Sequence, residues 1–309
     1  MTSPTPHFSN KFGAIALLLL VALVLACKID LGELANKGDQ TPTRPETDNP
    51  DFKRPTGNKK EVTLEEPEKP GGNSREKDKG DFLPQYSDIR NQSYVEFDQK
   101  MRQQKILESI TNDLNSNLSM PEDVTVTFRD CGVPNAFYNP QDKSVTMCYE
   151  FMDLFYNKYL QMGYSEEESN DLMFGATTFF FLHELGHCLI DVYDLPAVGR
   201  EEDSVDQLST YILMDKLKNG RKSALAGVLI FQALAADEQA SERTFADEHS
   251  LSSQRFYNLA CWMYGRDPDE FGSFKTKGVL PEARAVRCSD EYRKMSSAWQ
   301  RLVDPYVKK

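Results

Sequence analysis

The sequence predicts an α+β domain that is mostly helical, with a small β-hairpin placed before its longest helix. Two short segments, residues 123–130 and 143–149, alternate apolar and polar side chains as half-buried strands do. Beyond residue 150 apolar residues recur mostly at helical spacing, and the sequence has no internal repeat. A pair of strands followed by a series of helices predicts a sheet part and a helical part within one domain.

The first 27 residues have the pattern of an export signal. Lys11 precedes an apolar run over residues 12–27, which is short for a membrane span and typical of the core of a signal peptide. The small residue Ala26 suits cleavage before Cys27, and Cys27 also resembles the lipidated cysteine of bacterial lipoproteins. We therefore expect an exported protein anchored in the cell envelope, on the periplasmic or cell-surface side, by a lipid on Cys27. The alternatives are simple secretion after cleavage before Cys27 and an uncleaved anchor.

Residues 28–80 predict a disordered tether. They are rich in Pro, Gly, Lys and Glu and contain few large apolar side chains, so they bury too little surface to offset the loss of chain entropy. Residues 81–309 then remain as one folded domain. The net charge of −12 argues against nucleic acid as a main partner, because phosphate binding needs clustered Lys and Arg.

The folded elements are expected in the following order. Residues 93–120 carry apolar side chains near helical spacing and predict one amphipathic helix. The sequence NPQD at 139–142 has turn chemistry, so residues 135–149 predict a hairpin. Five further helices are expected at residues 170–193, 201–217, 223–239, 253–264 and 281–302.

Export favours disulfide bonds among the cysteines that follow Cys27. Five remain, so one stays unpaired, and Cys188 lies inside an apolar helical run. We therefore expect Cys188 to be reduced and two local disulfides to form, Cys131–Cys148 and Cys261–Cys288.

Two of the four histidines lie four residues apart in the sequence HELGH, within the apolar run FFFLHELGHCLID. On a helix, His183 and His187 project from one face about 5–6 Å apart, so both imidazoles reach one Zn²⁺ at about 2.0–2.1 Å. Glu184 is then placed to take a proton from a water activated by the metal, as in the HExxH motif of zinc peptidases. A metal is favoured over a pair of hydrogen-bonded core histidines, because burying these polar groups without a partner is costly.

A zinc site of this kind needs a third protein ligand. Ile190 and Tyr193 stand where the motif HExxHxxGxxH has its Gly and its third His, which excludes that pattern. In GREEDSVDQ, Glu202 and Asp206 lie four residues apart, and they resemble the Glu ligand and the His-orienting Asp of thermolysin-like gluzincins. We expect these two roles here, although the cluster also suits a charged helix start. The alternative ligands are Glu201, Asp203, Asp191 and Asp194.

The remaining histidine of the predicted domain is His249, in the sequence FADEHSLSSQRFYNL. A hydrogen-bond donor near the developing oxyanion assists peptide hydrolysis. We predict this role for His249, with Tyr257 or Arg255 as a second donor, and a helix-capping loop is the alternative.

Five segments together resemble a bacterial metallopeptidase family known as domain of unknown function 4344: CGVPNAFYNPQDKSVTMCYE, HELGHCLIDVYDLP, GREEDSVDQLST, DEHSLSSQRFYNLACWMYG and LPEARAVRCSDEYRK. The resemblance spans nearly all of the chain after the tether. It implies a zincin-like fold of the gluzincin type, with His183, His187 and Glu202 as zinc ligands and Glu184 as the base. The residues NAFY also resemble the hairpin of membrane-associated gluzincins, which implies residues 144–148 as an edge strand that pairs with the substrate backbone.

These observations predict a zinc-dependent peptidase of the cell envelope that acts on a peptide or protein substrate and is attached to the membrane by its N-terminal lipid. One alternative is a zinc-binding envelope protein without turnover. The presence of Glu184 argues against it, because a structural zinc site has no need of a base and closes its fourth position. The other alternative is a metal-dependent amidase acting on peptidoglycan.

Overall fold

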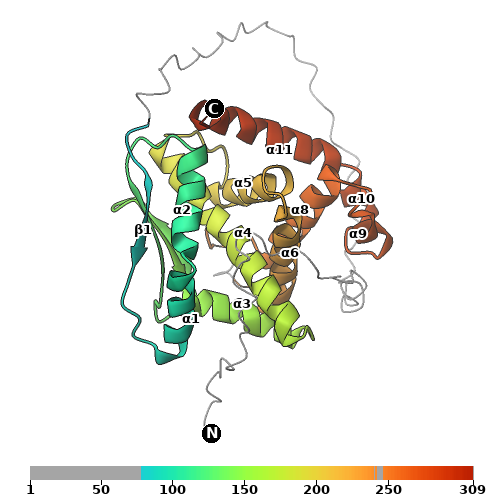
Figure 1. Cartoon of the computed structure of the whole chain (residues 1–309). Helices are drawn as coiled ribbons and strands as arrows, with labels where there is room; N and C mark the ends of the chain where they lie inside the picture. The colour runs from blue at the N-terminus through green and yellow to red at the C-terminus, as the bar shows by residue number, and fades with distance from the viewer. Residues whose placement is uncertain (1–77, 240, 242–245, 309) are drawn as a thin grey trace, which may run out of the picture.

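The computed structural model describes residues 78–239, 241 and 246–308. A small sheet with two helices beside it forms one side of the domain, and the remaining helices form the other (Figure 1). The predicted signal with Cys27, and the predicted tether up to residue 77, lie outside the described residues. None of the described helices combines the length and the apolar character that a membrane span requires.

The sheet contains four strands in the order β1-β2-β4-β3. β2 pairs in parallel with both β1 and β4, and β3 pairs antiparallel with β4, so the predicted hairpin at 135–149 is confirmed. The buried residues Val126, Val145 and Met147 explain why the alternating segments were recognisable as strands. The strands are β1 Phe82–Tyr86, β2 Val124–Arg129, β3 Ala136–Asn139 and β4 Ser144–Cys148.

The expectation that residues 144–148 form the edge strand is wrong. β4 is hydrogen-bonded to β2 on one side and to β3 on the other, so its backbone has no free edge. The two edge strands of the sheet are β3, which pairs with β4, and β1 at the opposite end. β1 contains Pro84, which suits an edge strand and obscures the strand in the sequence.

Two helices replace the single helix predicted at residues 93–120. α1 spans Gln92–Gln103 and α2 spans Ile106–Asn117. Lys105 between them has φ 54°, in the left-handed region, which interrupts helical hydrogen bonding. Met101 before the break and Leu107 after it are both buried in the core, so the apolar pattern continues across the break.

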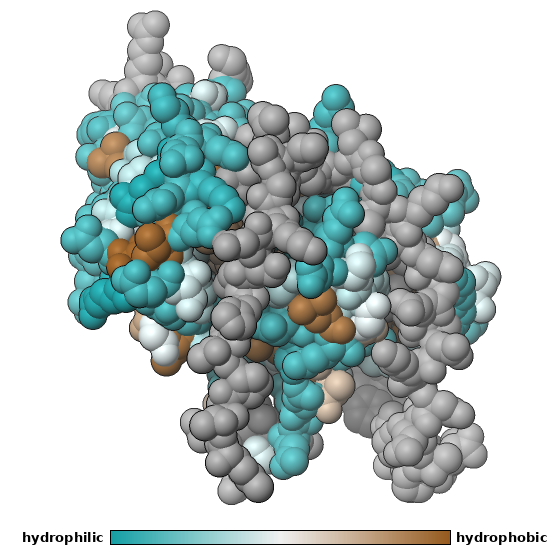
Figure 2. Space-filling view, turned by 60° about the horizontal axis from the view of Figure 1, so that its bottom comes forward, coloured by the Kyte–Doolittle hydropathy of each residue, from teal (hydrophilic) through white to brown (hydrophobic). Residues whose placement is uncertain are grey.

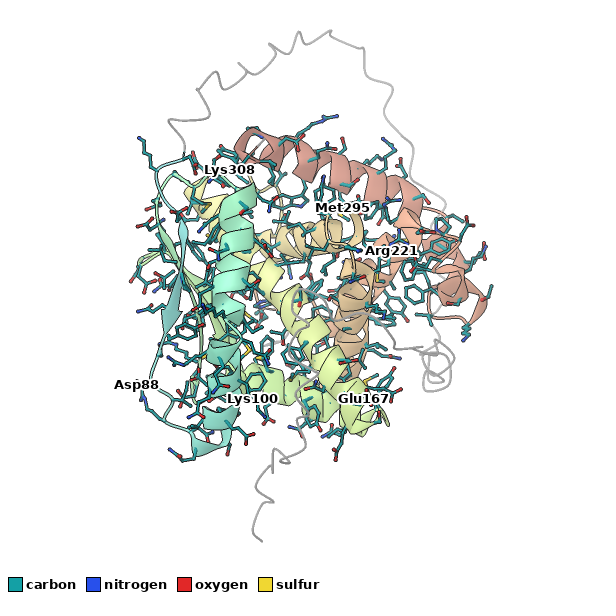
Figure 3. The ribbon with its side chains drawn as sticks, viewed as in Figure 1. Asp88, Lys100, Glu167, Arg221, Met295 and Lys308 are labelled. Atoms are coloured by element: carbon teal, nitrogen blue, oxygen red, sulfur yellow. A yellow bond between two sulfur atoms is a disulfide. The ribbon has the colours of Figure 1, made fainter. Side chains whose placement is uncertain are left out.

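The other helices form a bundle around α4, which packs against α3, α5 and α6. Their side chains are shown in Figure 3, where the exposed Glu167 marks the start of α4 and the buried Met295 lies on α11. The elements are α3 Tyr149–Gln161, α4 Glu166–Val192, α5 Glu201–Asp215, α6 Gly220–Asp237, α8 Ser252–Arg266, α9 Gly272–Thr276, α10 Glu282–Ala285, α11 Cys288–Val303 and the short 3-10 turn η2 Asp304–Tyr306.

α4 is the central element of the domain. Its start is fixed by a capping box, in which Ser165 and Glu168 each accept a backbone N–H from the other's residue. Most of its later residues are buried, as expected of a helix that is apolar on all sides. A Cβ on Gly186 would lie 2.8 Å from Val205 of α5, so glycine allows the close approach of α5 to the histidine face of α4.

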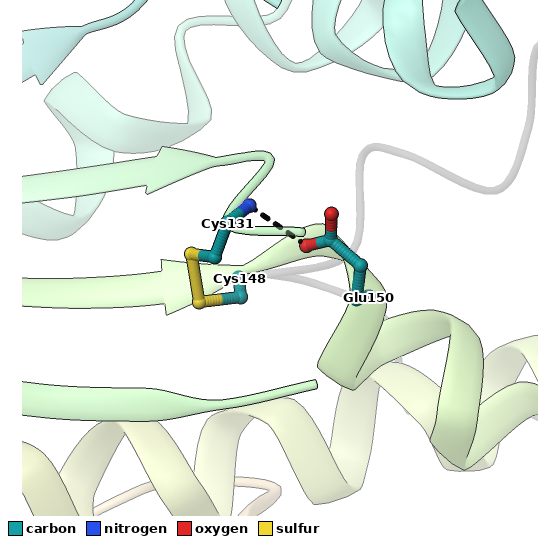
Figure 4. Close-up of side chains that lie close together, drawn as sticks. All are labelled: Cys131, Cys148 and Glu150. Carbon is teal, nitrogen blue, oxygen red and sulfur yellow. Dashed lines mark hydrogen bonds between the residues drawn. A yellow bond between two sulfur atoms is a disulfide. The ribbon is translucent and has the colours of Figure 1, made fainter. Parts of the chain in front are cut away.

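Both predicted disulfides are present, and Cys188 is buried and unpaired, as predicted. The first bond joins the loop after β2 to the end of β4 (Figure 4). The Glu150 carboxylate fastens the same loop by accepting the backbone N–H of Cys131 at 2.9 Å and that of Gly132 at 2.8 Å. The segment that leads into the edge strand β3 is therefore held at one end by a covalent bond and by two hydrogen bonds.

The face shown in Figure 2 is mostly hydrophilic, with hydrophobic side chains in small separate groups. Isolated apolar residues of this kind are normal on a protein surface. The described residues of this face therefore form no large apolar patch, and the functional candidates are polar side chains buried in the interior.

Candidate metal centre

The structure brings together the three residues predicted as metal ligands. His183 and His187 project from the same face of α4, with ring centroids 5.0 Å apart. Glu202, in the first turn of α5, places Oε2 3.0 Å from Nε2 of His183 and Oε1 3.3 Å from Nε2 of His187. The ligand atoms of the three side chains all lie within 4.8 Å of one another, which is the spacing that a shared metal ion requires.

A carboxylate contacts the other nitrogen of each histidine. Nδ1 of His183 lies 2.8 Å from Asp206, and Nδ1 of His187 lies 2.7 Å from Glu201. Each carboxylate can accept a hydrogen bond from Nδ1–H, which orients the ring so that Nε2 points toward Glu202. The sequence predicted this role for Asp206. Glu201 was considered as an alternative ligand, and its carboxylate contacts Nδ1 of His187 on the side away from Glu202.

Arg255 of α8 holds Asp206 in place. Its Nε and one terminal nitrogen donate to the two carboxylate oxygens, each at 2.7 Å. Although burial opposes it, Arg255 and His183 lower the pKa of Asp206 to about 2. The guanidinium also lies over the ring of Phe231, 4.2 Å from the centroid. Arg255, which was considered as an oxyanion donor, is therefore engaged in positioning a ligand.

Glu202 provides a test of whether a metal fits this site. Its Oε2 is buried and makes no hydrogen bond within the described part of the chain, although ring nitrogens of His183 and His249 lie 3.0 and 3.1 Å away. Burial raises the pKa of this carboxyl, but the surrounding histidines outweigh burial and hold the pKa well below its usual range. An ionised oxygen facing two imidazole nitrogens is a donor set that suits Zn²⁺.

Glu184 lies next to these ligands and is 7% exposed. Burial raises the pKa of its carboxyl, while the neighbouring histidines and the backbone N–H of Tyr138 on β3 partly offset the rise. A glutamate with a raised pKa is suited to accept a proton near neutral pH. Glu184 also lines a cavity of about 300 Å³ that is bordered by the start of β3, by α3, α4 and α6, and by the segment before α8.

His249 approaches the same carboxylate oxygen of Glu202 as His183 does. Its Nε2 is 3.1 Å from Glu202 Oε2, and its Nδ1 is 3.0 Å from Asp247. The loop that carries it is fastened to α5 because the hydroxyl of Ser250 donates to Asp203 at 2.7 Å. His249 is thus held beside the predicted ligands and lines the same cavity as Glu184.

The remaining candidates lie elsewhere. Tyr257 is 42% exposed and is absent from the residues that line the cavity. Asp191 accepts hydrogen bonds from Tyr138 at 2.5 Å and from Lys143 at 2.6 Å. Among the described residues, Asp194 does not belong to any group of side chains placed to share a metal ion.

The sequence did not predict the two hydrogen bonds from Arg255 to Asp206 or the contact between Glu201 and His187. A signal for the first was present, because Arg255 stands beside Phe256 in an apolar helical pattern, and a buried arginine needs an anionic partner. The second had no comparable signal, since three consecutive acidic residues at a helix start are common without any specific contact.

Comparison with known proteins supports a metal-dependent hydrolase. Neither curated proteins nor solved structures yield a match to this chain. A family model described as "Putative metallopeptidase" matches residues 86–303, which include every residue of the centre described above. The chain therefore belongs to this metallopeptidase family, domain of unknown function 4344.

Proposed function

We propose that the chain is a zinc-dependent peptidase with a gluzincin-like site. The observation that carries this proposal is the convergence of His183, His187 and Glu202, whose buried carboxylate faces both imidazoles, beside the buried Glu184. The family to which the chain belongs supports the same activity.

His183, His187 and Glu202 would hold the metal. When bound there, Zn²⁺ lowers the pKa of water and polarises the scissile carbonyl. The Glu184 carboxylate would accept a proton from the attacking water and transfer it to the leaving amine. Protonated His249, whose Nε2 lies 3.1 Å from Oε2 of Glu202, would donate to the developing oxyanion.

The edge strand β3 would align the substrate. Its other edge is paired with β4, and Glu184 and the cavity lie beside it. An extended peptide that adds to β3 through backbone hydrogen bonds would pass next to Glu184. This assigns to Ala136–Asn139 the role that the sequence had suggested for residues 144–148.

The cell envelope remains the proposed location, with attachment by a lipid on Cys27. The two disulfides support an oxidising compartment outside the cytoplasm. The net charge of −12 supports a peptide or protein rather than nucleic acid as the partner.

The test compares metal content and peptide hydrolysis of the full chain with those of Glu202→Ala and Glu184→Gln. We expect about one zinc per chain by elemental mass spectrometry, loss of zinc in Glu202→Ala, and retained zinc with at least a hundredfold loss of hydrolysis in Glu184→Gln. Glu167→Gln is the matched control, because Glu167 is an exposed glutamate on the same helix (Figure 3).

Two results would contradict the proposal. Equal hydrolysis by the wild type and Glu184→Gln would exclude Glu184 as the base. If Glu202→Ala binds zinc as tightly as the wild type, Glu202 is not a ligand.

A further inference from the structure

Tyr138 fastens the edge strand β3 to α4 at two points. Its backbone N–H contacts the carboxylate of Glu184, and its hydroxyl donates to the carboxylate of Asp191 at 2.5 Å. Glu184 and Asp191 are seven residues apart, which is about two turns of helix, so they lie on the same side of α4. Contacts at both points hold the strand against sliding along α4 and against rotation.

The pairing of the hairpin shows which backbone groups face the free edge of β3. The backbone N–H of Cys148 donates to the carbonyl of Asn135 at 3.1 Å. In an antiparallel pair, residues whose backbone groups point to the partner strand alternate with residues whose groups point away. Ala136 and Tyr138 therefore direct their backbone groups toward the free edge. Tyr138 uses its N–H for Glu184, and Ala136, which lines the cavity, offers its groups to a substrate.

Asp191 also binds the hairpin at its turn. Lys143, the residue before β4, places its ammonium 2.6 Å from the same carboxylate. Burial raises the pKa of Asp191, but the hydrogen bonds from Lys143 and Tyr138 outweigh burial and lower the pKa. The carboxylate is therefore ionised and suited to accept both donors. One acidic side chain of α4 thus contacts a strand residue and a turn residue of the hairpin.

The contact reaches the surface of the domain. The side chains of Asp191 and Lys143 are 35% and 25% exposed. Ion pairs that reach solvent contribute little to folding stability. The rate of a reaction is far more sensitive to position, because a displacement of about 1 Å can lower it on the order of a hundredfold. Loss of this contact should therefore affect turnover more than stability.

We infer that Asp191 is a positioning residue, which through Tyr138 sets the place of β3, and of a substrate paired with it, relative to Glu184. The inference rests on the proposed peptidase function and adds a residue that does not touch the reacting atoms. Without this contact β3 stays paired with β4, so a substrate still binds while its alignment with the base is lost. The effect should appear in kcat and hardly in KM.

The test measures steady-state hydrolysis by the zinc-loaded full chain of the internally quenched peptide that the wild type cleaves fastest in a mixed library. We expect Tyr138→Phe and Asp191→Ala each to lower kcat about tenfold, with KM changed less than threefold and zinc content unchanged. Asp191→Asn keeps an acceptor for the tyrosine hydroxyl and should recover part of the loss. It also replaces Asp191→Ala if the alanine variant has a lowered Tm.

A double variant shows whether the two side chains act together. If Tyr138 acts through Asp191, adding Tyr138→Phe to Asp191→Ala should lower kcat less than about twofold further. Additive losses would mean that the hydroxyl of Tyr138 acts independently of Asp191, which overturns the inference.

A second tyrosine provides the matched control. The hydroxyl of Tyr292 on α11 donates to Asp215 at 2.9 Å, and Asp215 also pairs with Arg266. This group again combines a tyrosine, an aspartate and a cation, but none of its members lines the cavity. Tyr292→Phe should leave kcat and KM within about twofold of the wild-type values.

The outcomes separate this inference from the proposed function. If the wild type cleaves the peptide and Tyr138→Phe keeps kcat within twofold, or Tyr292→Phe lowers kcat equally, Asp191 does not position β3 and the peptidase function still stands. A raised KM with unchanged kcat would also overturn the inference, because the contact would then serve binding alone. If the wild type cleaves no peptide of the library, both proposals are overturned.

Discussion

Two carboxylates orient the proposed zinc ligands in very different surroundings. Asp206 is 2% exposed and is bonded to Arg255 through both oxygens. Glu201 contacts His187 from a position that is about half open to solvent. A buried, clamped carboxylate fixes its histidine more firmly than an exposed one, because water competes for the exposed contact and the side chain keeps more rotamer freedom.

We therefore expect Asp206→Asn to weaken zinc binding by about 10–100-fold and Glu201→Gln to weaken it by less than about tenfold. Asp206→Asn also leaves the guanidinium of Arg255 buried without its counter-charge, which costs about 3–5 kcal/mol of folding stability. Competition with a chelator measures the first effect, and denaturant unfolding of the metal-free chain measures the second. Equal losses of zinc affinity in the two variants would contradict the distinction.

At the scale of secondary structure, the loop between β2 and β3 determines how the edge strand is presented. The Cys131–Cys148 disulfide and the Glu150 carboxylate fix the start of this loop, and Asn135 at its end lines the cavity. The second disulfide, Cys261–Cys288, joins α8 to the start of α11. The two disulfides close loops of similar length, with sequence separations of 17 and 27 residues. They therefore differ mainly in which segments of the fold they connect.

Replacing either cysteine pair by serine should destabilise the protein by about 2–4 kcal/mol, because the closed loops are of similar size. Only the loss of Cys131–Cys148 should raise KM for a peptide substrate, since it frees the segment that leads into β3. Urea unfolding and steady-state kinetics of the two double variants measure these effects. The second variant is the control for destabilisation without a change at the edge strand, and an equal rise of KM in both would exclude this role for the first disulfide.

At the scale of the whole molecule, features set by one helical turn and by the cysteine count were predictable, whereas the pairing of the strands and the partner of Asp206 were not. HELGH and the spacing of Glu202 and Asp206 follow from one helical turn, so the sequence alone indicated a metal site. The edge position of β3 depends on β2 pairing with β4, and the clamp on Asp206 depends on Arg255, 49 residues away. The periodicity of apolar residues does not encode such pairings. It also did not show that the helix is interrupted at Lys105.

The domain as a whole should depend more strongly on pH without zinc than with zinc. Although burial opposes it, Glu202 and Glu201 raise the pKa of His187 from 6.5 to about 9. In the metal-free protein the charged His187 therefore stabilises the fold fully below pH 6.5, and this contribution is lost as pH rises through about 9. Zinc needs the neutral imidazole, so binding displaces the proton and becomes tighter as pH rises.

The difference in Tm between the zinc-loaded and the metal-free chain should consequently widen between pH 6.5 and 9. Thermal unfolding at constant buffered free zinc, beside samples with EDTA, measures this difference. His187→Gln removes the titrating group, so its metal-free Tm should depend less on pH in this window than that of the wild type. A difference that stays constant with pH in the wild type would mean that zinc does not displace a proton from His187, and the assignment of this histidine as a ligand would fail.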